Sequence, residues 1–243
     1  MLLVGFIFSK HIYMNIFQTH KNMNYILKNK QLSQSVYSWA KYNNHSFNYH
    51  FYSDEQCDLF MKNIAPTINK DIYNAYCRLP LAVMKADLWR YCIIYHLGGI
   101  YADTDTICKT NPTLFINDSL LTIVPENSCH LCQWVFAAPK GSSILKSVID
   151  LSVKRILTIK EINGEHIIHY LTGPEVFTDG IEKYLKEHNL TTFEHNKKLY
   201  YNYPHKCELR VFNCDIFHSK IVQHLFYGQR NDGWCAKRDK YLL

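Results

Sequence analysis

The chain has 243 residues, of which 47% are hydrophobic and 20% are charged. That length suits one large domain with its own core, and the composition excludes an intrinsically disordered chain. The formal net charge is only +6, and the lysines and arginines are scattered along the sequence. A nucleic-acid-binding protein concentrates such residues on one element, so we expect no nucleic acid among the partners.

The N-terminal segment is apolar but short. Its run from Leu2 to Phe8 is far below the roughly 20 residues that a membrane-spanning helix needs, and no clean cleavage site follows it. We therefore expect one domain over residues 1–243, with residues 1–13 as a dispensable extension. The nine cysteines lack the spacing of a disulfide scaffold and indicate reduced thiols. These features predict a cytoplasmic protein without a transmembrane segment, and they leave room for a peripheral membrane contact.

Strand and helix patterns alternate along the first quarter of the chain. A buried strand is expected over 12–19, an amphipathic helix over 32–42 and a second strand over 47–52. A further helix should begin at Asp54, because Ser53 is a favourable N-cap residue and acidic side chains follow it. This β-α-β-α order predicts an α/β fold.

The strongest predicted helix begins at Pro80 and ends at Gly98-Gly99. Proline fits the first turn of a helix, and glycine suits the position just after its last residue. Beyond this helix the patterns predict three strands, two helices and a last apolar segment, at 100–102, 120–124, 134–138, 142–159, 173–188 and 221–227.

Two aspartates stand close together in the segment GGIYADTDTICK, residues 98–109. On an extended chain Asp103 and Asp105 point to the same side, and neighbouring carboxylates repel each other unless a cation or a donor meets them. Mg²⁺ binds one or two carboxylates and fills its other positions with water and phosphate oxygens, and Mn²⁺ accepts similar ligands. The pair therefore predicts a divalent metal that links the protein to a diphosphate.

Several kinds of protein use closely spaced aspartates. An EF-hand is excluded, because Ile107 and Cys108 stand where its loop needs an oxygen ligand and a glycine. A haloacid-dehalogenase-like Mg-dependent phosphatase would use one Asp as nucleophile, although its motif usually opens the fold. A transferase acting on a nucleotide-diphosphate sugar is the third candidate. A non-enzymatic binding module is a fourth, but it would not need a metal and a charged helix pair in one pocket.

The predicted helix before the aspartates carries a charged pair in apolar surroundings. Asp87 and Arg90 are three residues apart and share one face of the helix. Their neighbours are apolar or aromatic nearly all round the helix: Leu88, Trp89, Tyr91, Ile93, Ile94 and Leu97. Such a helix is buried, and buried charges need partners, so we expect the pair to face a cavity.

Together these motifs resemble the DXD-containing sugar-binding region of glycosyltransferase family 32. The resemblance rests on ADLWRY at 86–91 and LGGIYADTD at 97–105, and it extends to IFQTHK at 16–21, YHFYSD at 49–54 and TGP at 172–174. That family includes the initiating α-1,6-mannosyltransferases of fungi, and its donor site resembles that of the clostridial glucosylating toxins. The resemblance implies a GT-A-type fold, a Rossmann-like α/β domain with a mixed central sheet.

The resemblance also implies a function and a set of site residues. The chain would be a retaining hexosyltransferase that moves a sugar from a GDP- or UDP-sugar to a glycan, glycolipid or protein. Asp87, Arg90, Asp103 and Asp105 would be catalytic. Asp103, Asp105 and His224 would bind Mn²⁺ or Mg²⁺. The donor would be bound by Gln18, Thr19, Asp87, Arg90, Tyr101, Asp103 and Trp234, and the loop at 173–175 would face the acceptor or cap the helix that follows it.

Overall fold

The part of the chain that the structure describes contains eight strands in two sheets. The computed structural model describes residues 14–43, 47–115, 120–126, 130–164, 166–189, 209–211 and 217–226. The strands are β1 (Met14–Thr19), β2 (Phe47–Tyr52), β3 (Gly99–Ala102), β4 (Thr106–Cys108), β5 (Leu121–Ile123), β6 (Val135–Ala138), β7 (Leu209–Val211) and β8 (Val222–His224). The central sheet has the order β2-β1-β3-β6-β5-β7, and β4 pairs with β8 in a small second sheet.

The central sheet is mixed. Strand β1 runs parallel to both β2 and β3, whereas β6 runs antiparallel to its neighbours β3 and β5. The α/β fold with a mixed central sheet that the sequence predicts is therefore confirmed.

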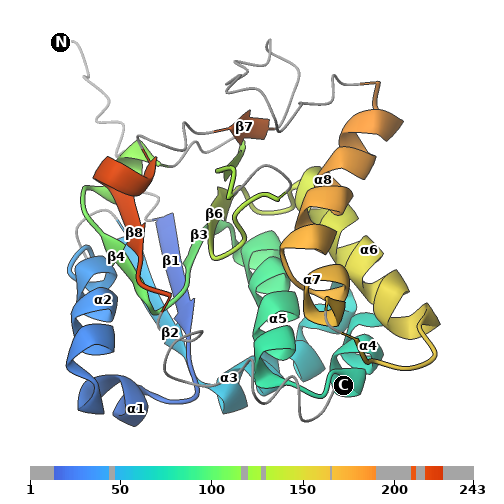
Figure 1. Ribbon diagram of the computed structural model, residues 1–243, viewed down its shortest axis with the longest axis horizontal. Helices are drawn as coiled ribbons and strands as arrows, with labels where there is room; N and C mark the ends of the chain where they lie inside the picture. Colours follow the sequence, from blue (N-terminus) through green and yellow to red (C-terminus); the bar gives the residue numbers. More distant parts are fainter. Residues whose placement is uncertain are drawn as a thin grey trace, which may run out of the picture.

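Helices cover both faces of the central sheet. They are α1 (Met23–Lys28), α2 (Lys30–Ala40), α3 (Asp54–Asn63), α4 (Ile72–Arg78), α5 (Ala82–Leu97), α6 (Ser143–Thr158), α7 (Ile167–Leu171) and α8 (Pro174–Glu187). Figure 1 shows α5, α6 and α8 on one side of the sheet, and α2 with the β4–β8 pair on the other. None of the helices in the described ranges is long and apolar enough to cross a bilayer.

The strand side chains alternate between the two halves of the core. Phe17, Tyr101 and Phe136 join the larger cluster, which also holds the apolar side chains of α5, α6 and α8. Their neighbours Ile16 and Ile100 point the other way and pack with Trp39 of α2 and Val222 of β8. This period of two is what a sheet covered on both faces requires.

Local sequence signals explain where the key elements begin and end. Ser53 caps α3 as predicted, in a capping box in which Gln56 bonds back to the backbone of Ser53. The start of α5 differs from the prediction: Leu81 is the N-cap, with extended backbone angles, so Pro80 lies before the helix rather than in its first turn.

The glycine pair ends α5 and turns the chain into β3. Gly98 donates its backbone N–H to the carbonyl of Ile94, and Gly98 and Gly99 have φ angles of 71° and 122°. Residues other than glycine rarely adopt these backbone angles. A Cβ at Gly99 would also collide with the backbone oxygen of Asn15, so the glycine lets β3 lie directly against β1. The chain thereby leaves a buried helix and enters the centre of the sheet just before the aspartates.

Candidate active site

The two aspartates lie in the tight turn between β3 and β4. The carbonyl of Asp103 accepts the backbone N–H of Thr106 at 3.1 Å and its hydroxyl at 2.6 Å. The backbone N–H of Asp103 donates to the carbonyl of Trp134, which precedes β6, at 2.8 Å. Asp103 is therefore fixed from both sides at the end of the central strand β3.

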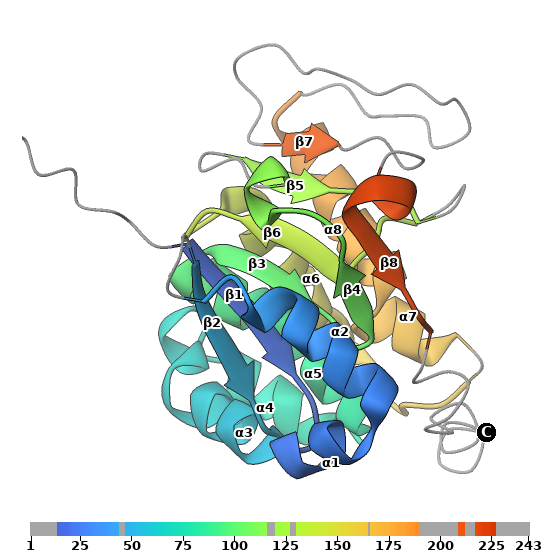
Figure 2. The same cartoon turned by 90° about the vertical axis from the view of Figure 1, so that its left-hand side faces the viewer.

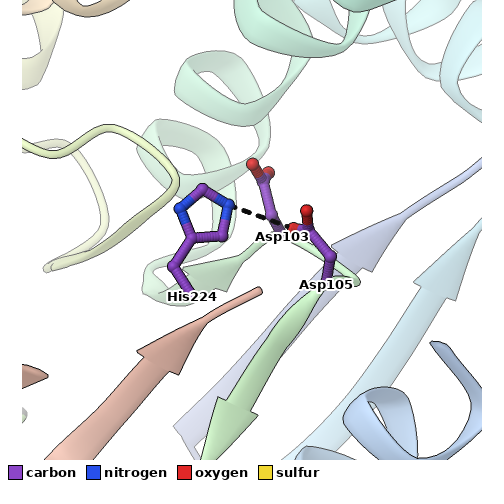
Figure 3. Close-up of side chains that lie close together, drawn as sticks. All are labelled: Asp103, Asp105 and His224. Carbon is purple, nitrogen blue, oxygen red and sulfur yellow. Dashed lines mark ion pairs between the residues drawn. The ribbon is translucent and has the colours of Figure 1, made fainter. Parts of the chain in front are cut away.

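Pairing between β4 and β8 brings His224 to the same place. Thr106 lies opposite His224 in this antiparallel pair, and the backbone N–H of Leu225 donates to the carbonyl of Asp105 at 2.9 Å. The Nε2 atom of His224 lies 3.3 Å from Oδ1 of Asp105 (Figure 3). The imidazole stacks on Trp134, with ring centroids 4.5 Å apart, so its orientation is set by packing.

The three side chains fit a divalent metal ion. One possible ligand atom from each of Asp103, Asp105 and His224 lies within 4.8 Å of the others. Carboxylate oxygens suit Mg²⁺ and Mn²⁺, and the imidazole nitrogen adds a ligand more typical of transition metals, which favours Mn²⁺. The carboxylate of Asp103 keeps one oxygen available for such an ion, because Arg90 and Tyr101 both bind its Oδ1.

Arg90 connects this group to Asp87 on helix α5. Its Nη2 atom lies 2.9 Å from Oδ1 of Asp87 and 3.2 Å from Oδ1 of Asp103, and its guanidinium lies over the ring of Tyr101 at 4.5 Å. The hydroxyl of Tyr101 donates to Asp103 at 2.5 Å. The Asp87–Arg90 pair thus reaches the turn between β3 and β4 directly.

Asp87 is also held by Gln133, which precedes β6, and by Thr172, which precedes α8. Its carboxylate accepts a hydrogen bond from the Gln133 amide at 3.2 Å and another from the Thr172 hydroxyl at 3.1 Å. Burial raises the pKa of Asp87 to about 6, and the nearby negative charge of Asp103 adds to the shift, while Arg90 opposes it. Arg90, and to a smaller extent these two donors, therefore favour the ionised carboxylate against the effect of burial.

A cavity of about 560 Å³ collects these side chains. One end is strongly acidic, since Asp87, Asp103, Asp105 and Glu126 lie there beside a single guanidinium, that of Arg90. Burial raises the pKa of both Asp103 and Glu126. Carboxylates crowded in this way favour a bound cation.

The other end of the cavity is more apolar. It is lined by Leu32, Ala82, Val83, Ala86 and the ring of Tyr25, with Asp54, His20 and Lys21 as its polar groups. This end lies beside the carboxyl end of β1, and the cavity as a whole runs from there to the paired aspartates. It can hold an elongated ligand with a flat apolar part at one end and anionic groups at the other.

Most residues named from the sequence lie in this cavity. Its walls include Thr19, Asp87, Arg90, Tyr101, Asp103, Asp105 and His224, together with Gly173 and Pro174 of the predicted loop. Gln18 lies behind the wall: it is fully buried, donates to the carbonyl of Asp103 at 3.0 Å and accepts from the hydroxyl of Tyr49 at 2.9 Å. Trp234 lies outside the described residues.

Three site residues were not found by sequence reasoning. Gln133 and Thr172 bind Asp87, and Glu126 adds a carboxylate to the cavity wall. Thr172 had a signal, the TGP segment. Gln133 and Glu126 had none. Gln133 meets the site through the pairing of β6 with β3, and Glu126 follows β5, which pairs with β6, so neither position is marked by a local motif.

The segment that contains most of these site residues matches a known protein family. Residues 6–125 match the family described as "Glycosyltransferase sugar-binding region containing DXD motif". That segment contains both aspartates of the turn and the Asp87–Arg90 pair. Over these residues the chain is similar to that family.

Curated relatives of the family cover only part of the chain. It is 25% identical over 175 residues to the "Initiation-specific alpha-1,6-mannosyltransferase" of Candida albicans, a match that spans 58% of this chain and 45% of that protein. The protein of the same name from Schizosaccharomyces pombe is 29% identical over 168 residues, which is 59% of this chain and 42% of the relative. The "Uncharacterized glycosyltransferase L373" of Acanthamoeba polyphaga mimivirus is 24% identical over 143 residues, 59% of this chain and 55% of that one. The chain thus spans about half the length of the curated relatives that it matches.

A solved structure extends the likeness to the fold. The chain superimposes on "PaToxG Glycosyltransferase" with a TM-score of 0.53 and 20% sequence identity, over 71% of this chain and 69% of the other. The implied GT-A-like fold is thereby confirmed. The phosphatase alternative finds no support in any of these comparisons.

Proposed function

We propose that the chain is a retaining glycosyltransferase that moves a hexose from a nucleotide-diphosphate donor to a glycan, glycolipid or protein acceptor. The proposal rests on one observation: a set of potential metal ligands and a buried charged pair line the same cavity. Asp103, Asp105 and His224 form a metal-type ligand set, and Asp87 and Arg90 face the same space. The match of residues 6–125 to the DXD family model supports the same function.

The ligand set would hold Mn²⁺ or Mg²⁺ next to the donor diphosphate. When bound, the ion would neutralise the negative charge that develops on the departing diphosphate. Asp105 is the more direct ligand in this proposal, because Arg90 and Tyr101 already share one oxygen of Asp103. Asp103 would then bind the ion through its second oxygen or accept a hydroxyl of the donor.

Arg90 and Asp87 would recognise the transferred sugar. Arg90 is only 4% exposed and is positioned by two carboxylates and an aromatic ring, so its guanidinium presents fixed N–H donors to phosphate or sugar oxygens. Asp87, oriented by Gln133 and Thr172, would accept hydrogen bonds from sugar hydroxyls. Such preorganisation lowers the cost of orienting the donor.

The apolar end of the cavity would take the nucleotide base. Ala82 and Val83 offer a flat surface for a guanine or uracil ring, and Thr19 lies where the ribose would follow. Tyr101 would pack beside the nucleotide, and Gly173 and Pro174 line the side from which an acceptor would enter. The retained configuration is part of the proposal, and the α-linkage named in the two fungal relatives supports it.

A panel of GDP- and UDP-hexoses tests this function. With Mn²⁺ present, we expect slow hydrolysis of one or a few donors, which releases the nucleoside diphosphate, and loss of that activity in excess EDTA. Full turnover in EDTA would contradict the metal-dependent mechanism. Release of inorganic phosphate from phosphate monoesters, with no turnover of any nucleotide sugar, would instead identify a phosphatase. Stabilisation by a nucleotide sugar without turnover of donor or acceptor would identify a binding module.

A further inference from the structure

The acidic residues of the chain are distributed unevenly. None of its 21 aspartates and glutamates lies within residues 1–53, and the first is Asp54. The same stretch contains Lys10, Lys21, Lys28, Lys30 and Lys41. Helices α1 and α2 fall within it, so neither helix carries an acidic side chain.

The outward face of α2 is a basic and aromatic stripe. Lys30, Gln34, Tyr37 and Lys41 recur at helical spacing and are exposed, with Tyr37 exposed by 68%. The opposite face packs into the core through Leu32, Val36 and Trp39. An ordinary solvated helix face mixes charges of both signs, whereas this stripe has only one.

Helix α1 adds exposed aliphatic side chains to the stripe. Met23 and Leu27 are one turn apart on the same side and are exposed by 36% and 65%. Lys21 and Lys28 lie next to them in the chain and are exposed as well. Figures 1 and 2 show α1 and α2 side by side at one corner of the molecule.

Asp54 offsets part of the positive charge of this surface, at its border with the cavity, where it interacts electrostatically with Lys21. Among the ion pairs between described residues, none includes Lys21, Lys28, Lys30 or Lys41. By contrast, Lys146 and Lys183 on α6 and α8 each pair with a carboxylate one turn away. We call the surface formed by Lys21, Met23, Leu27, Lys28, Lys30, Tyr37 and Lys41 the basic face.

We propose that the basic face docks the protein onto an anionic membrane surface. Lysines are attracted by acidic lipid headgroups, and aliphatic and tyrosine side chains between them can enter the headgroup boundary. A nucleic acid would use the charge but would have no use for Met23 and Leu27, which are aliphatic and cannot stack on bases. The combination therefore favours a lipid surface.

Docking in this way would bring the cavity close to the membrane. Lys21 belongs to the basic face and also lines the cavity, as does Tyr25 of α1. The cavity mouth and the docking surface therefore share a border. If the proposed function is correct, an acceptor displayed on a lipid headgroup lies within reach, but the docking itself does not depend on that function.

Co-sedimentation with vesicles tests the proposal on the full chain. We expect binding to vesicles of phosphatidylcholine with 30% phosphatidylserine, weak binding to phosphatidylcholine alone, and strong weakening at high salt. Each basic side chain near an anionic surface contributes a factor of about five, so Lys28→Ala/Lys30→Ala should weaken binding about 30-fold. Leu27→Glu should weaken it at least as much as the loss of one lysine.

Matched variants separate docking from a general effect of charge. Leu59 on α3 is exposed by 59% but follows acidic residues. Leu59→Glu changes the net charge as Leu27→Glu does and should leave vesicle binding unchanged. Lys154→Ala/Lys186→Ala, at exposed positions of α6 and α8, should have no more than a twofold effect. Thermal melts of all variants would verify that each is folded.

Two results would overturn the proposal. One is equal binding of the wild-type protein to neutral and anionic vesicles, or equal losses in the control variants. The other is tight binding to a single-stranded RNA that Lys28→Ala/Lys30→Ala weakens and Leu27→Glu does not, without any binding to vesicles. That second result would reassign the basic face to nucleic acid.

Discussion

Arg90 determines the charge balance of the cavity. It contacts Asp87 and Asp103 at the same time, and it is almost completely buried. Asp105 and Glu126 add two more carboxylates at the same end of the cavity, so one guanidinium faces four acidic groups there. The divalent cation that we propose on Asp103, Asp105 and His224 would offset this excess of negative charge.

Changing His224 should separate metal binding from folding. We expect His224→Ala to weaken Mn²⁺ binding by at least about 10–100-fold, since losing one of three proposed ligands should cost no less than losing an outer-shell partner of a ligand. Isothermal titration with Mn²⁺ in the presence of a nucleoside diphosphate measures this. His218 is a suitable control, because its ring also packs on Trp134, at 5.5 Å, but it is not part of the ligand set. Equal affinities in both variants would rule out His224 as a ligand.

The stability of the metal-free protein should depend on pH through Asp87. Burial raises the pKa of the folded-state carboxyl to about 6, whereas an unfolded chain loses this proton near pH 4. The folded state therefore holds an extra proton between these values, and stability falls as pH rises through the window. One pKa unit is about 1.4 kcal/mol, so we expect a loss of about 1–3 kcal/mol.

Urea unfolding at pH 5 and pH 7.5, in EDTA, measures this loss. Asp87→Asn has no carboxyl to titrate, so the difference in unfolding free energy between wild type and variant should change between the two pH values. A constant difference would mean that Asp87 ionises normally in the folded protein.

The sequence identifies the charged residues of the site better than the residues that hydrogen-bond to them. Asp87, Arg90, Asp103 and Asp105 are visible because a motif or an unusual setting marks each of them. Gln133, by contrast, is an amide in an unremarkable segment, and it reaches Asp87 only because β6 pairs with β3. Non-local pairing leaves no periodic signal in the chain, which is why this residue was missed.

At the scale of elements, long periodic segments were predictable and short ones were not. Strand β2 and helix α3 begin where the sequence indicates, because alternation and the N-cap at Ser53 are local signals. Helices α4 and α7, with seven and five residues, carry too few turns for a pattern to appear. Strand β4 has three residues and exists because β8 returns to pair with it.

Close packing of α6 against α8 yields a prediction about Gly180. A Cβ at this position would lie 2.6 Å from the Cα of Val148, which is backbone and cannot rotate away. In a free helix Gly→Ala is stabilising by about 1 kcal/mol. Here we expect Gly180→Ala to destabilise the protein by about 1–3 kcal/mol, because overpacking forces the helices apart.

Chemical denaturation measures this effect, with Lys186→Ala at an exposed position of the same helix as control. The control should change the unfolding free energy by less than about 0.5 kcal/mol. A stabilised Gly180→Ala variant would show that the two helices do not approach as closely as described.

At the scale of the whole molecule, ligand binding should raise the melting temperature. Mn²⁺ with a nucleoside diphosphate should bind only the folded chain, because folding alone brings together the residues proposed to bind them. These residues come from the β3–β4 turn, from α5 and from β8. At a ligand concentration about 100 times the dissociation constant, this linkage is worth about 2.7 kcal/mol. For a domain of this size it corresponds to an increase of about 5–10 °C.

Thermal shift measurements with each component alone provide the control. The nucleotide without Mn²⁺ should have a much smaller effect, since the acidic end of the cavity repels phosphate. An equal shift in EDTA would mean that the nucleotide binds without a metal.

The most direct test of the central claim is donor turnover by Asp105→Ala at increasing Mn²⁺. Asp105 lies in a turn held mainly through its backbone, so the variant should keep the melting temperature of the metal-free wild type to within a few degrees. We expect its Mn²⁺-dependent hydrolysis of the best nucleotide sugar to fall at least about 100-fold, as it does when a group acting on the transition state is removed. Wild-type turnover by the folded variant would contradict the assignment of the metal to Asp103, Asp105 and His224.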